Sequence, residues 1–372
     1  MKSCERVVII VAVVTLVGRI AAAGSLSKVW DFNTGDVAGT GTSASSVPLG
    51  VFALSFSPDG EHIVAVVGRS RREEFILALG ASAPQTNRKR LDINPQIWEL
   101  DPYMYDRLSW STSGQHLVLG RMIVNLSNGN VCSLPEGDGF FFVGPSEVVG
   151  RELKTKTTIR LSFFDLDCHG THTLDLGSGW DLYDASAERG LLCLWQFSYT
   201  GVYAQQVVSI MDAGTNKILR RLPLPPAETA PSVTMQRFAD NGKAVCGVGG
   251  RDWRRTVRCE DVDTGREIGA AKGYTALDVR TALRAKRAIL SDYGRKLDGD
   301  LQWVEGSLKK RAVWDFGTGK ELVSWRPKSQ TLYSGEPRPY SDTGPYRFAI
   351  SPDGEYVVEG GAGTLSLYKI EP

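Results

Sequence analysis

The chain has 372 residues, of which 42% are hydrophobic and 23% are charged, an ordinary globular composition. These proportions exclude a disordered polymer, a collagen, a coiled coil and a polytopic membrane protein. The 43 basic and 42 acidic residues give a formal net charge of +1, so we do not expect a nucleic-acid partner bound through overall positive charge.

Residues 1–23 have the features of a secretory signal peptide. Two basic residues begin the segment, an apolar run covers residues 7–18, and the small residues Ala21 and Ala23 stand at its end. The apolar run is too short to cross a hydrocarbon core of about 30 Å as a helix. We therefore expect residues 24–372 to be one domain in the periplasm or outside the cell. The alternative is an uncleaved N-terminal membrane anchor with the domain facing outside.

After residue 24, short alternating or apolar runs are separated by glycine, proline, aspartate and asparagine, which is typical of an all-β protein. One unit recurs, a strand followed by a tight turn and a second strand. It covers residues 52–67 and 347–358, where the turn reads Ser-Pro-Asp-Gly, and looser copies cover 108–119 and 236–247. Proline presets φ in such a turn, and Asp-Gly tolerates its backbone.

A second signature lies between these copies. Residues 29–35 and 313–319 are near copies, Val-Trp-Asp-Phe followed by a polar residue or glycine and then Thr-Gly. Looser versions fall at 126–129, 167–170, 211–215 and 262–265. Each is expected to end one strand, turn on a glycine and begin another. The two signatures together predict a four-stranded meander.

Seven such units can be counted along the chain. Their first turns are centred near Gly60, Gly114, Glu147, Gly190, Gly242, Lys286 and Gly354, at a mean spacing of about 49 residues. Four-stranded repeats of roughly 40–50 residues indicate a β-propeller. We predict an all-β, seven-bladed β-propeller of antiparallel blades. Because the turns near 147, 190 and 286 match weakly, six and eight blades remain as alternatives.

The two ends of the chain predict how the ring closes. The last unit stops after its third strand near Ile370, whereas residues 28–37 read as the third and fourth strands of a unit. We therefore expect residues 28–39 to pair with residues 365–370 and to supply the missing outer strand. Such pairing leaves the ring without an open edge at this blade.

With these repeats, the chain resembles the WD40-like bacterial β-propeller repeat proteins over residues 25–372. The matching residues are Trp30-Asp31, Trp314-Asp315 and the Ser-Pro-Asp-Gly turns at 57–60 and 351–354. The resemblance implies a seven-bladed scaffold that binds partners. Because no Gly-His dipeptide precedes an innermost strand, the buried His–Asp network of eukaryotic WD40 proteins is not expected. The resemblance thus bears on fold more than on function.

The candidate binding residues lie in the loops between second and third strands. Strand direction alternates, so these loops and the blade-to-blade connections share one face, here called the long-loop face. Its candidates are Arg69, Arg71, Arg72, Lys154, Lys156, Tyr199, Tyr203, Arg251, Trp253, Arg254 and Arg255. Arginine beside aromatic rings is the composition of binding hot spots. We expect a protein, peptide or glycan partner with acidic character, and we expect Trp253 to be an apolar anchor.

The opposite face, here called the tight-turn face, is expected to be acidic. Its carboxylates are Asp59, Glu61, Asp240, Asp263, Asp315, Asp353 and Glu355. Two segments rich in potential metal ligands, residues 165–172 and 260–267, fall on turns and are interpreted as turns. No cofactor, metal or catalytic residue is predicted. The rival class is a propeller enzyme resembling a lactonase or a quinone-dependent dehydrogenase, which needs His, Asp or Glu converging at the axial channel.

Five cysteines follow residue 24, an odd number that leaves at least one outside any intramolecular disulfide. If residues 251–254 form the loop of a hairpin, Cys246 stands opposite Cys259. We therefore predict that these two cysteines are cross-strand neighbours. A disulfide between them would persist in an oxidising compartment.

Overall fold

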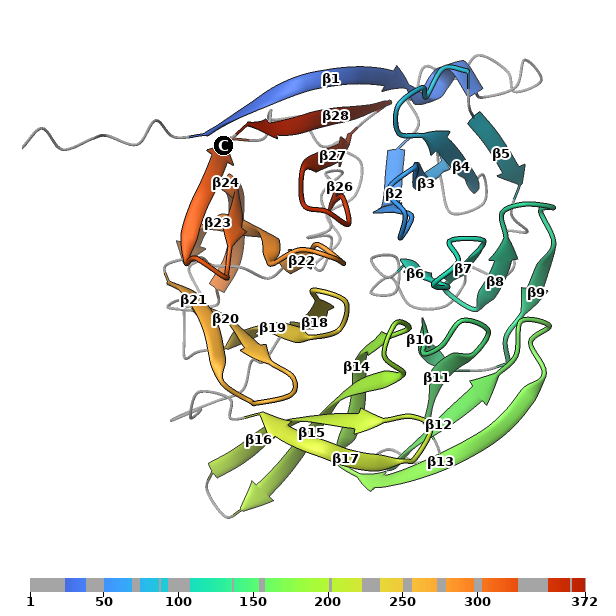
Figure 1. Cartoon of the computed structure of the whole chain (residues 1–372), viewed down its shortest axis with the longest axis vertical. Helices are drawn as coiled ribbons and strands as arrows, with labels where there is room; N and C mark the ends of the chain where they lie inside the picture. The colour runs from blue at the N-terminus through green and yellow to red at the C-terminus, as the bar shows by residue number, and fades with distance from the viewer. Residues whose placement is uncertain are drawn as a thin grey trace, which may run out of the picture.

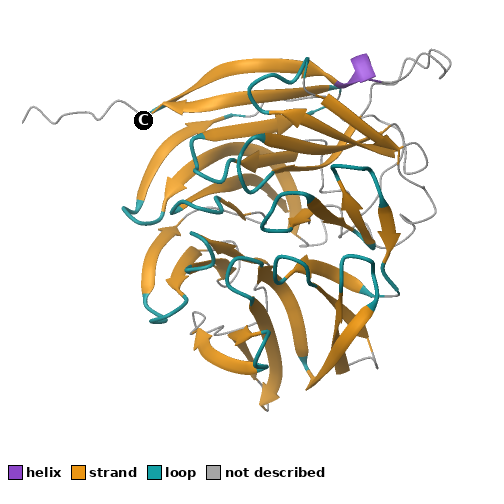
Figure 2. Cartoon of the chain, turned by 45° about the vertical axis from the view of Figure 1, so that its right-hand side comes forward, coloured by secondary structure: helices purple, strands orange, loops and turns teal. Residues whose placement is uncertain are grey.

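The computed structural model describes residues 24–37, 50–68, 74–86, 88–92, 108–135, 137–153, 158–200, 203–222, 235–249, 256–272, 279–297, 303–326, 347–361 and 363–371. Seven four-stranded antiparallel sheets stand in a ring around one axis (Figure 1). The fold is therefore the predicted seven-bladed β-propeller, and the six- and eight-bladed alternatives are excluded. Strands make up most of the described chain (Figure 2). None of its helices is long and apolar enough to cross a membrane.

Each blade places its strands in chain order from the axis outward, so blade one is β2 to β5 and blade seven is β26 to β28 with β1. The innermost strands are β2 (Gly50–Phe56), β6 (Leu108–Trp110), β10 (Asp138–Phe142), β14 (Trp180–Ser186), β18 (Met235–Ala239), β22 (Val279–Thr281) and β26 (Arg347–Ile350). The second strands are β3 (His62–Gly68), β7 (His116–Leu119), β11 (Val148–Leu153), β15 (Leu191–Thr200), β19 (Ala244–Gly249), β23 (Arg287–Leu297) and β27 (Tyr356–Gly360).

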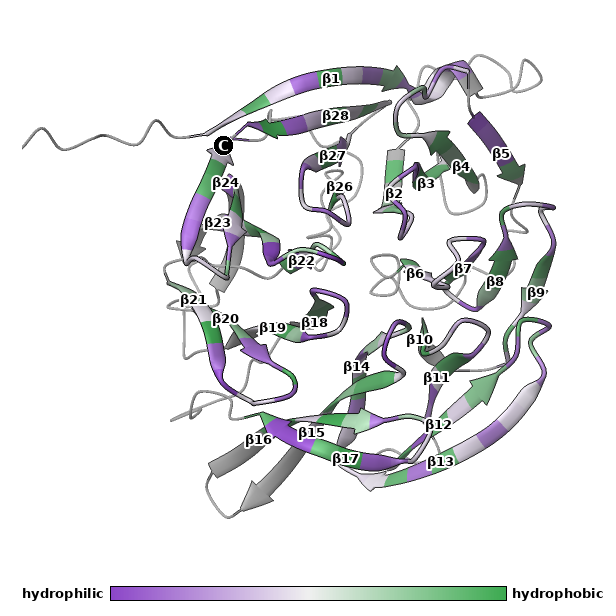
Figure 3. Ribbon diagram, in the orientation of Figure 1, coloured by the Kyte–Doolittle hydropathy of each residue, from purple (hydrophilic) through white to green (hydrophobic). Residues whose placement is uncertain are grey.

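The third strands are β4 (Glu74–Gly80), β8 (Met122–Asn125), β12 (Thr158–Phe164), β16 (Tyr203–Asp212), β20 (Thr256–Asp261), β24 (Trp303–Asp315) and β28 (Thr364–Glu371). The outer strands are β5 (Arg88–Asp92), β9 (Val131–Ser133), β13 (Gly170–Ser178), β17 (Lys217–Leu222), β21 (Glu267–Lys272), β25 (Lys320–Trp325) and β1 (Ser25–Asn33). Hydrophilic residues are prominent on the outer strands β5, β13 and β17, whereas β8 is mainly hydrophobic (Figure 3).

Serine hydroxyls hold the turns between first and second strands. The hydroxyls of Ser57, Ser111 and Ser351 each accept the backbone N–H five residues later, at 2.9, 3.1 and 2.9 Å. The following glycines, including Gly60 and Gly354, have positive φ angles of 83° and 75°, which glycine adopts without a steric cost. All seven predicted first turns fall between the first and second strands of a blade.

Aspartate carboxylates hold several of the turns between third and fourth strands. Asp212 and Asp261 each accept the N–H of the threonine three residues later at 2.7 Å, a side-chain mimic of a backbone turn. In the segment 165–172, the Asp165 carboxylate accepts the N–H groups of Asp167 and His169 at 2.9 and 2.8 Å. The residues that could have suggested metal binding therefore shape a turn in the same way.

The N-terminal strand closes the ring, as predicted. Strand β1 pairs antiparallel with β28, from Ser25 opposite Glu371 to Asn33 opposite Thr364. One detail of the prediction is wrong. Residues 34–37 form the short 3-10 helix η1 (Thr34–Val37) rather than a turn into another strand of the same unit.

The two Val-Trp-Asp-Phe copies consequently occupy different places in their blades. Trp314 lies on β24, the third strand of blade six, whereas Trp30 lies on β1, the outermost strand of blade seven. The Trp30 indole N–H donates to the carbonyl of Ala81 in blade one at 2.7 Å. The N-terminal copy thus joins the last blade to the first. The repeated sequence alone did not reveal that the two copies occupy different strands of their blades.

The hydrophobic core lies between neighbouring blades. Each adjacent pair of blades shares at least one cluster of buried apolar side chains. Between blades seven and one, for example, Phe32 and Leu365 pack with Val51 and Leu77, and all four are no more than 3% exposed. Neighbouring blades thus pack face to face as the two sheets of a sandwich do, and this packing repeats around the ring. The rigid ring fixes the positions of the axial and surface sites.

Candidate functional site

Most candidate residues of the long-loop face lie outside the described residues. These are Arg69, Arg71, Arg72, Lys154, Lys156, Arg251, Trp253, Arg254 and Arg255. The remaining two candidates, Tyr199 and Tyr203, lie at the end of the β15–β16 hairpin, where Tyr199 pairs with Ala204 and Thr200 pairs with Tyr203. The structure brings these two tyrosines to one hairpin tip.

Two long hairpins extend toward the long-loop face. In blade six, β22 pairs with β23 only as far as Val279 opposite Leu290, while β23 and β24 continue together to Leu297 opposite Trp303. In blade four, β14 begins opposite Gln196, and β15 and β16 continue to Thr200 opposite Tyr203. Both hairpins therefore extend beyond the innermost strand of their blade. The long-loop face thus has projecting hairpins, whereas the described part of the opposite face has tight turns.

The tight-turn face carries basic side chains beside its predicted carboxylates. Arg189 forms an ion pair with Asp263 at 2.7 Å. Arg284 and Arg287 donate to the backbone carbonyls of Asp59 and Gly354, at 3.1 and 2.8 Å. These contacts join blade four to blade five and blade six to blades one and seven. One of these arginines pairs with a turn carboxylate, and all three link neighbouring blades.

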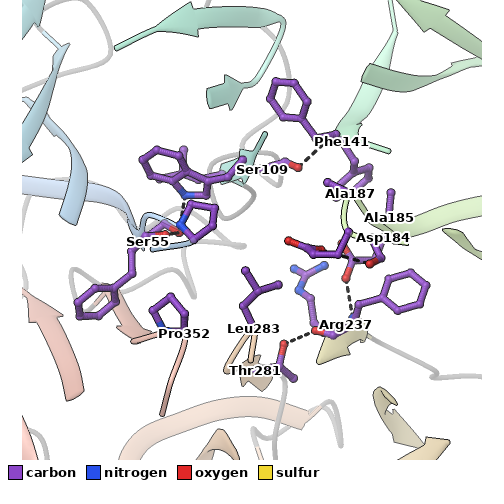
Figure 4. A pocket seen from close by; sticks show the side chains of 18 of the residues that line it. Ser55, Ser109, Phe141, Asp184, Ala185, Ala187, Arg237, Thr281, Leu283 and Pro352 are labelled. Carbon is purple, nitrogen blue, oxygen red and sulfur yellow. Dashed lines mark hydrogen bonds between the residues drawn. The ribbon is translucent and has the colours of Figure 1, made fainter. Parts of the chain in front are cut away.

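A cavity of about 210 Å³ lies on the axis at the tight-turn end of the channel (Figure 4). Innermost strands or their turns from all seven blades contribute to its wall. Its lining residues are Ser55, Phe56, Ser57, Pro58, Leu108, Ser109, Trp110, Phe141, Phe142, Asp184, Ala185, Ser186, Ala187, Glu188, Arg237, Phe238, Arg280, Thr281, Leu283, Ile350 and Pro352. The wall is mostly apolar or small, with four charged side chains.

The strand register identifies one equivalent position per blade in this wall. In the seven blades that position holds Ser55, Ser109, Phe141, Asp184, Arg237, Arg280 and Ala349, of which all but Ala349 line the cavity. Serine, aromatic, acidic, basic and small residues thus occupy structurally matching sites. The repeat units seen in the sequence span this position, but its side chains differ from blade to blade, so it is not part of the recurring pattern.

Several polar side chains at this position bond to the next blade. The Trp110 indole N–H donates to the Ser55 hydroxyl at 3.0 Å. The backbone N–H of Phe142 donates to the Ser109 hydroxyl at 2.9 Å, and that of Phe238 donates to the Asp184 carboxylate at 2.8 Å. These hydroxyl and carboxylate groups therefore satisfy buried donors between blades.

Two disulfides differ in what they join. Cys246 stands opposite Cys259 in the register of β19 and β20, with a Cα–Cα distance of 4.0 Å, and the two are bonded. A second disulfide, Cys132–Cys168, joins the outer strand of blade two to a turn of blade three. The sequence offered no hairpin pairing that could identify this second bond. Cys193 is a buried free thiol, and burial raises its pKa.

Comparisons with known proteins bear on the fold. No protein-family model matches the sequence, and no curated protein matches it. Among solved structures, the chain is similar to the β-propeller domain of Cps50 (Swd1) from Myceliophteria thermophila, with a TM-score of 0.53 and 11% identity. The match covers 93% of this chain and 99% of that one. The chain is thus similar in fold to a solved β-propeller domain, in agreement with its own seven-bladed architecture.

Proposed function

We propose that this protein is an exported, non-catalytic β-propeller scaffold that binds an acidic protein, peptide or glycan at its long-loop face. The observation that carries the proposal is that polar side chains in the wall of the axial cavity already have hydrogen-bond partners. Ser55, Ser109 and Asp184 are bonded to the neighbouring blades. The other carboxylate of the wall, Glu188, accepts the hydroxyl of Ser186. An enzyme with axial chemistry would instead need such groups to converge on a substrate.

The shape of the long-loop face supports binding there. The β15–β16 and β23–β24 hairpins continue past their innermost strands on this side. Loops on a rigid scaffold are where binding residues concentrate. The sequence places arginines and Trp253 in the loop between β19 and β20, which belongs to the same face. The basic and aromatic character of the loops favours an acidic partner.

Export is supported by two independent features. Residues 1–23 have the composition of a signal peptide. The two disulfides, Cys132–Cys168 and Cys246–Cys259, are of the kind that persists in oxidising compartments. A fusion of residues 1–23 to a reporter that is active only after export tests this part. Sequencing the N-terminus of the recovered protein then separates a cleaved signal from an anchor.

The binding site is tested with charge reversals on opposite faces. The triple variant Arg251→Glu, Arg254→Glu and Arg255→Glu should lose at least tenfold in affinity for a partner captured from the exported fraction. The matched control, Lys243→Glu, Arg266→Glu and Lys320→Glu, reverses three exposed charges on the tight-turn face and should bind normally. Binding of the unmodified protein should weaken with salt, since exposed charges are screened beyond about 8–10 Å. If only the control triple variant loses binding of the partner, the binding site lies on the tight-turn face and the proposal is wrong.

A further inference from the structure

Arg237 is a charged side chain buried at the wall of the axial cavity. It lies on the innermost strand of blade five, is 9% exposed, and points into the cavity (Figure 4). Its hydrogen bond, from Nη1 to the carbonyl of Tyr183, is long at 3.5 Å. Among the described residues, no carboxylate forms an ion pair with it. A guanidinium has five N–H donors, and burying its charge without a counter-charge is costly.

The other lining residues indicate which kind of ligand could pair with the Arg237 charge. Phe56, Phe141 and Leu283 provide apolar surface from three different blades. Ser109, from blade two, accepts the N–H of Phe142 and retains its own O–H as a donor. Arg280 is a second cation in the wall. A cavity with two cationic side chains, a hydroxyl donor and apolar surface is complementary to a molecule with an anionic head and an apolar body.

Two carboxylates limit how much negative charge the cavity can accept. Asp184 and Glu188 both line it. Asp184 accepts the N–H of Phe238, and Glu188 accepts the hydroxyl of Ser186 at 3.3 Å. A second negative charge on a bound molecule would therefore lie near one or both carboxylates and be repelled. The charges of Arg237 and Arg280 are balanced by those of Asp184 and Glu188, so the lining has no excess positive charge to hold a second negative charge and favours a monoanion over a dianion.

We propose that the axial cavity is a second binding site, distinct from the long-loop face, for a small organic monocarboxylate with an apolar body. The carboxylate binds the Arg237 guanidinium, and two parallel N–H···O bonds are the geometry this pair prefers. The apolar body lies against Phe56, Phe141 and Leu283.

Calorimetric titration of the mature protein with hexanoate and phenylacetate tests the site. Both acids should bind, and the uncharged analogues hexan-1-ol and 2-phenylethanol should bind at least tenfold more weakly, because they cannot form a charged bond with Arg237. Adipate, which carries a second carboxylate, should also bind at least tenfold more weakly than hexanoate. Failure of both monocarboxylates to bind, or equal binding of acids and alcohols, would overturn the proposal.

Two variants place the acids in the cavity. Arg237→Met should lose hexanoate binding at least tenfold and retain or raise the thermal midpoint of the ligand-free protein, because it removes a buried charge that lacks an ion pair. Leu283→Trp, on another blade, should fill the cavity and abolish binding. Arg266→Met changes an exposed arginine of the same face and should bind normally. Normal hexanoate binding by folded Arg237→Met or Leu283→Trp refutes the site. The long-loop triple variant should keep hexanoate binding, so the two sites are tested separately.

Discussion

The Arg311 guanidinium lies 2.6 Å from the Glu359 carboxylate, and its side chain is only 1% exposed. The pair joins β24 of blade six to β27 of blade seven. The same carboxylate oxygen accepts the indole N–H of Trp325 at 3.0 Å. The guanidinium carbon also stands 3.8 Å from the ring centroid of Phe348 on the innermost strand of blade seven. One half-buried carboxylate thus organises a charged contact between the last two blades.

Replacing Glu359 by Gln should destabilise the ring strongly. The substitution leaves the Arg311 charge buried without its carboxylate, and breaking a buried pair by removing one partner costs about 3–5 kcal/mol. Urea unfolding followed by tryptophan fluorescence measures the change. The double variant Arg311→Met, Glu359→Gln should regain part of the loss, because it removes the buried positive charge as well.

A neighbouring ion pair supplies the control. Lys310 precedes Arg311 on β24 and lies 3.0 Å from Glu321, but both side chains are about 40% exposed. Glu321→Gln should therefore cost less than about 1 kcal/mol, the usual range for an exposed pair. Equal losses in Glu359→Gln and Glu321→Gln would show that burial does not determine the strength of the blade-six contact.

Ring closure should depend on Phe32. This residue is fully buried between blades seven and one, although the strand that carries it, β1, is the first described strand of the chain. Phe32→Ala should lower the free energy of unfolding by about 3–5 kcal/mol, the range for removing a buried phenylalanine. Val29→Ala, on the same strand but 48% exposed, should change it by less than about 0.5 kcal/mol. A small effect of Phe32→Ala would mean that the ring is stable without β1.

The blades could be predicted from sequence because their turns repeat. Ser57 and Ser351, for example, each bond the backbone after a glycine with positive φ, and few other residues make such a turn. Because each blade needs such a turn, the same residues recur in the sequence at regular spacing. The different roles of Trp30 and Trp314 could not be separated in this way, because identical local text is compatible with two positions in a blade.

The axial site could not be predicted for a related physical reason. Its wall is built from equivalent positions occupied by unlike residues, among them Ser109, Asp184 and Arg237. They meet only because the ring brings seven distant strands to one axis. The Cys132–Cys168 bond is similar, since it joins different blades. Cys246–Cys259 was accessible from sequence because both cysteines belong to one hairpin.

Stability should fall as pH rises from weakly acidic values toward neutrality because of Glu260. Its side chain is buried on β20, and burial, with a smaller contribution from Glu267 opposite it, raises its pKa from 4.5 to about 7, against the opposing effect of Arg258. Above pH 4.5 the unfolded carboxyl loses its proton first, while the folded one keeps it until about pH 7. The unfolded state therefore gains relative stability across this window, and the loss levels off above it.

Glu260→Gln removes this titration. Its urea midpoint should fall less between pH 5 and pH 8 than that of the unmodified protein, and the gain from the substitution should be larger at pH 8. Glu61→Gln, which changes an exposed carboxylate in the first turn of blade one, should leave the pH dependence as it is. A parallel decline in the unmodified protein and Glu260→Gln would assign the pH effect to other groups.

The two disulfides should differ in their accessibility to reductant. Cys246 and Cys259 are fully buried within blade five, whereas Cys132 and Cys168 are partly exposed where blades two and three meet. Reductant can reach the first pair only when the blade opens, and buried strands open with free energies approaching that of global unfolding. In native conditions, a phosphine reductant followed by alkylation and mass spectrometry should therefore label Cys132 and Cys168 first.

The two disulfides should also differ in how much each contributes to the free energy of unfolding. The Cys132–Cys168 bond spans a sequence separation of 36 and the Cys246–Cys259 bond one of 13. The chain-entropy model then gives losses of about 4 and about 3 kcal/mol for replacing the first pair by serine and the second by alanine. Cys193→Ser serves as the control for the accessibility experiment, since it should leave both labelling rates unchanged if the fold tolerates it. If all four bonded cysteines are instead labelled at one common rate in the unmodified protein, reduction proceeds through global unfolding, and the blade-two to blade-three bond is as protected as the one inside blade five.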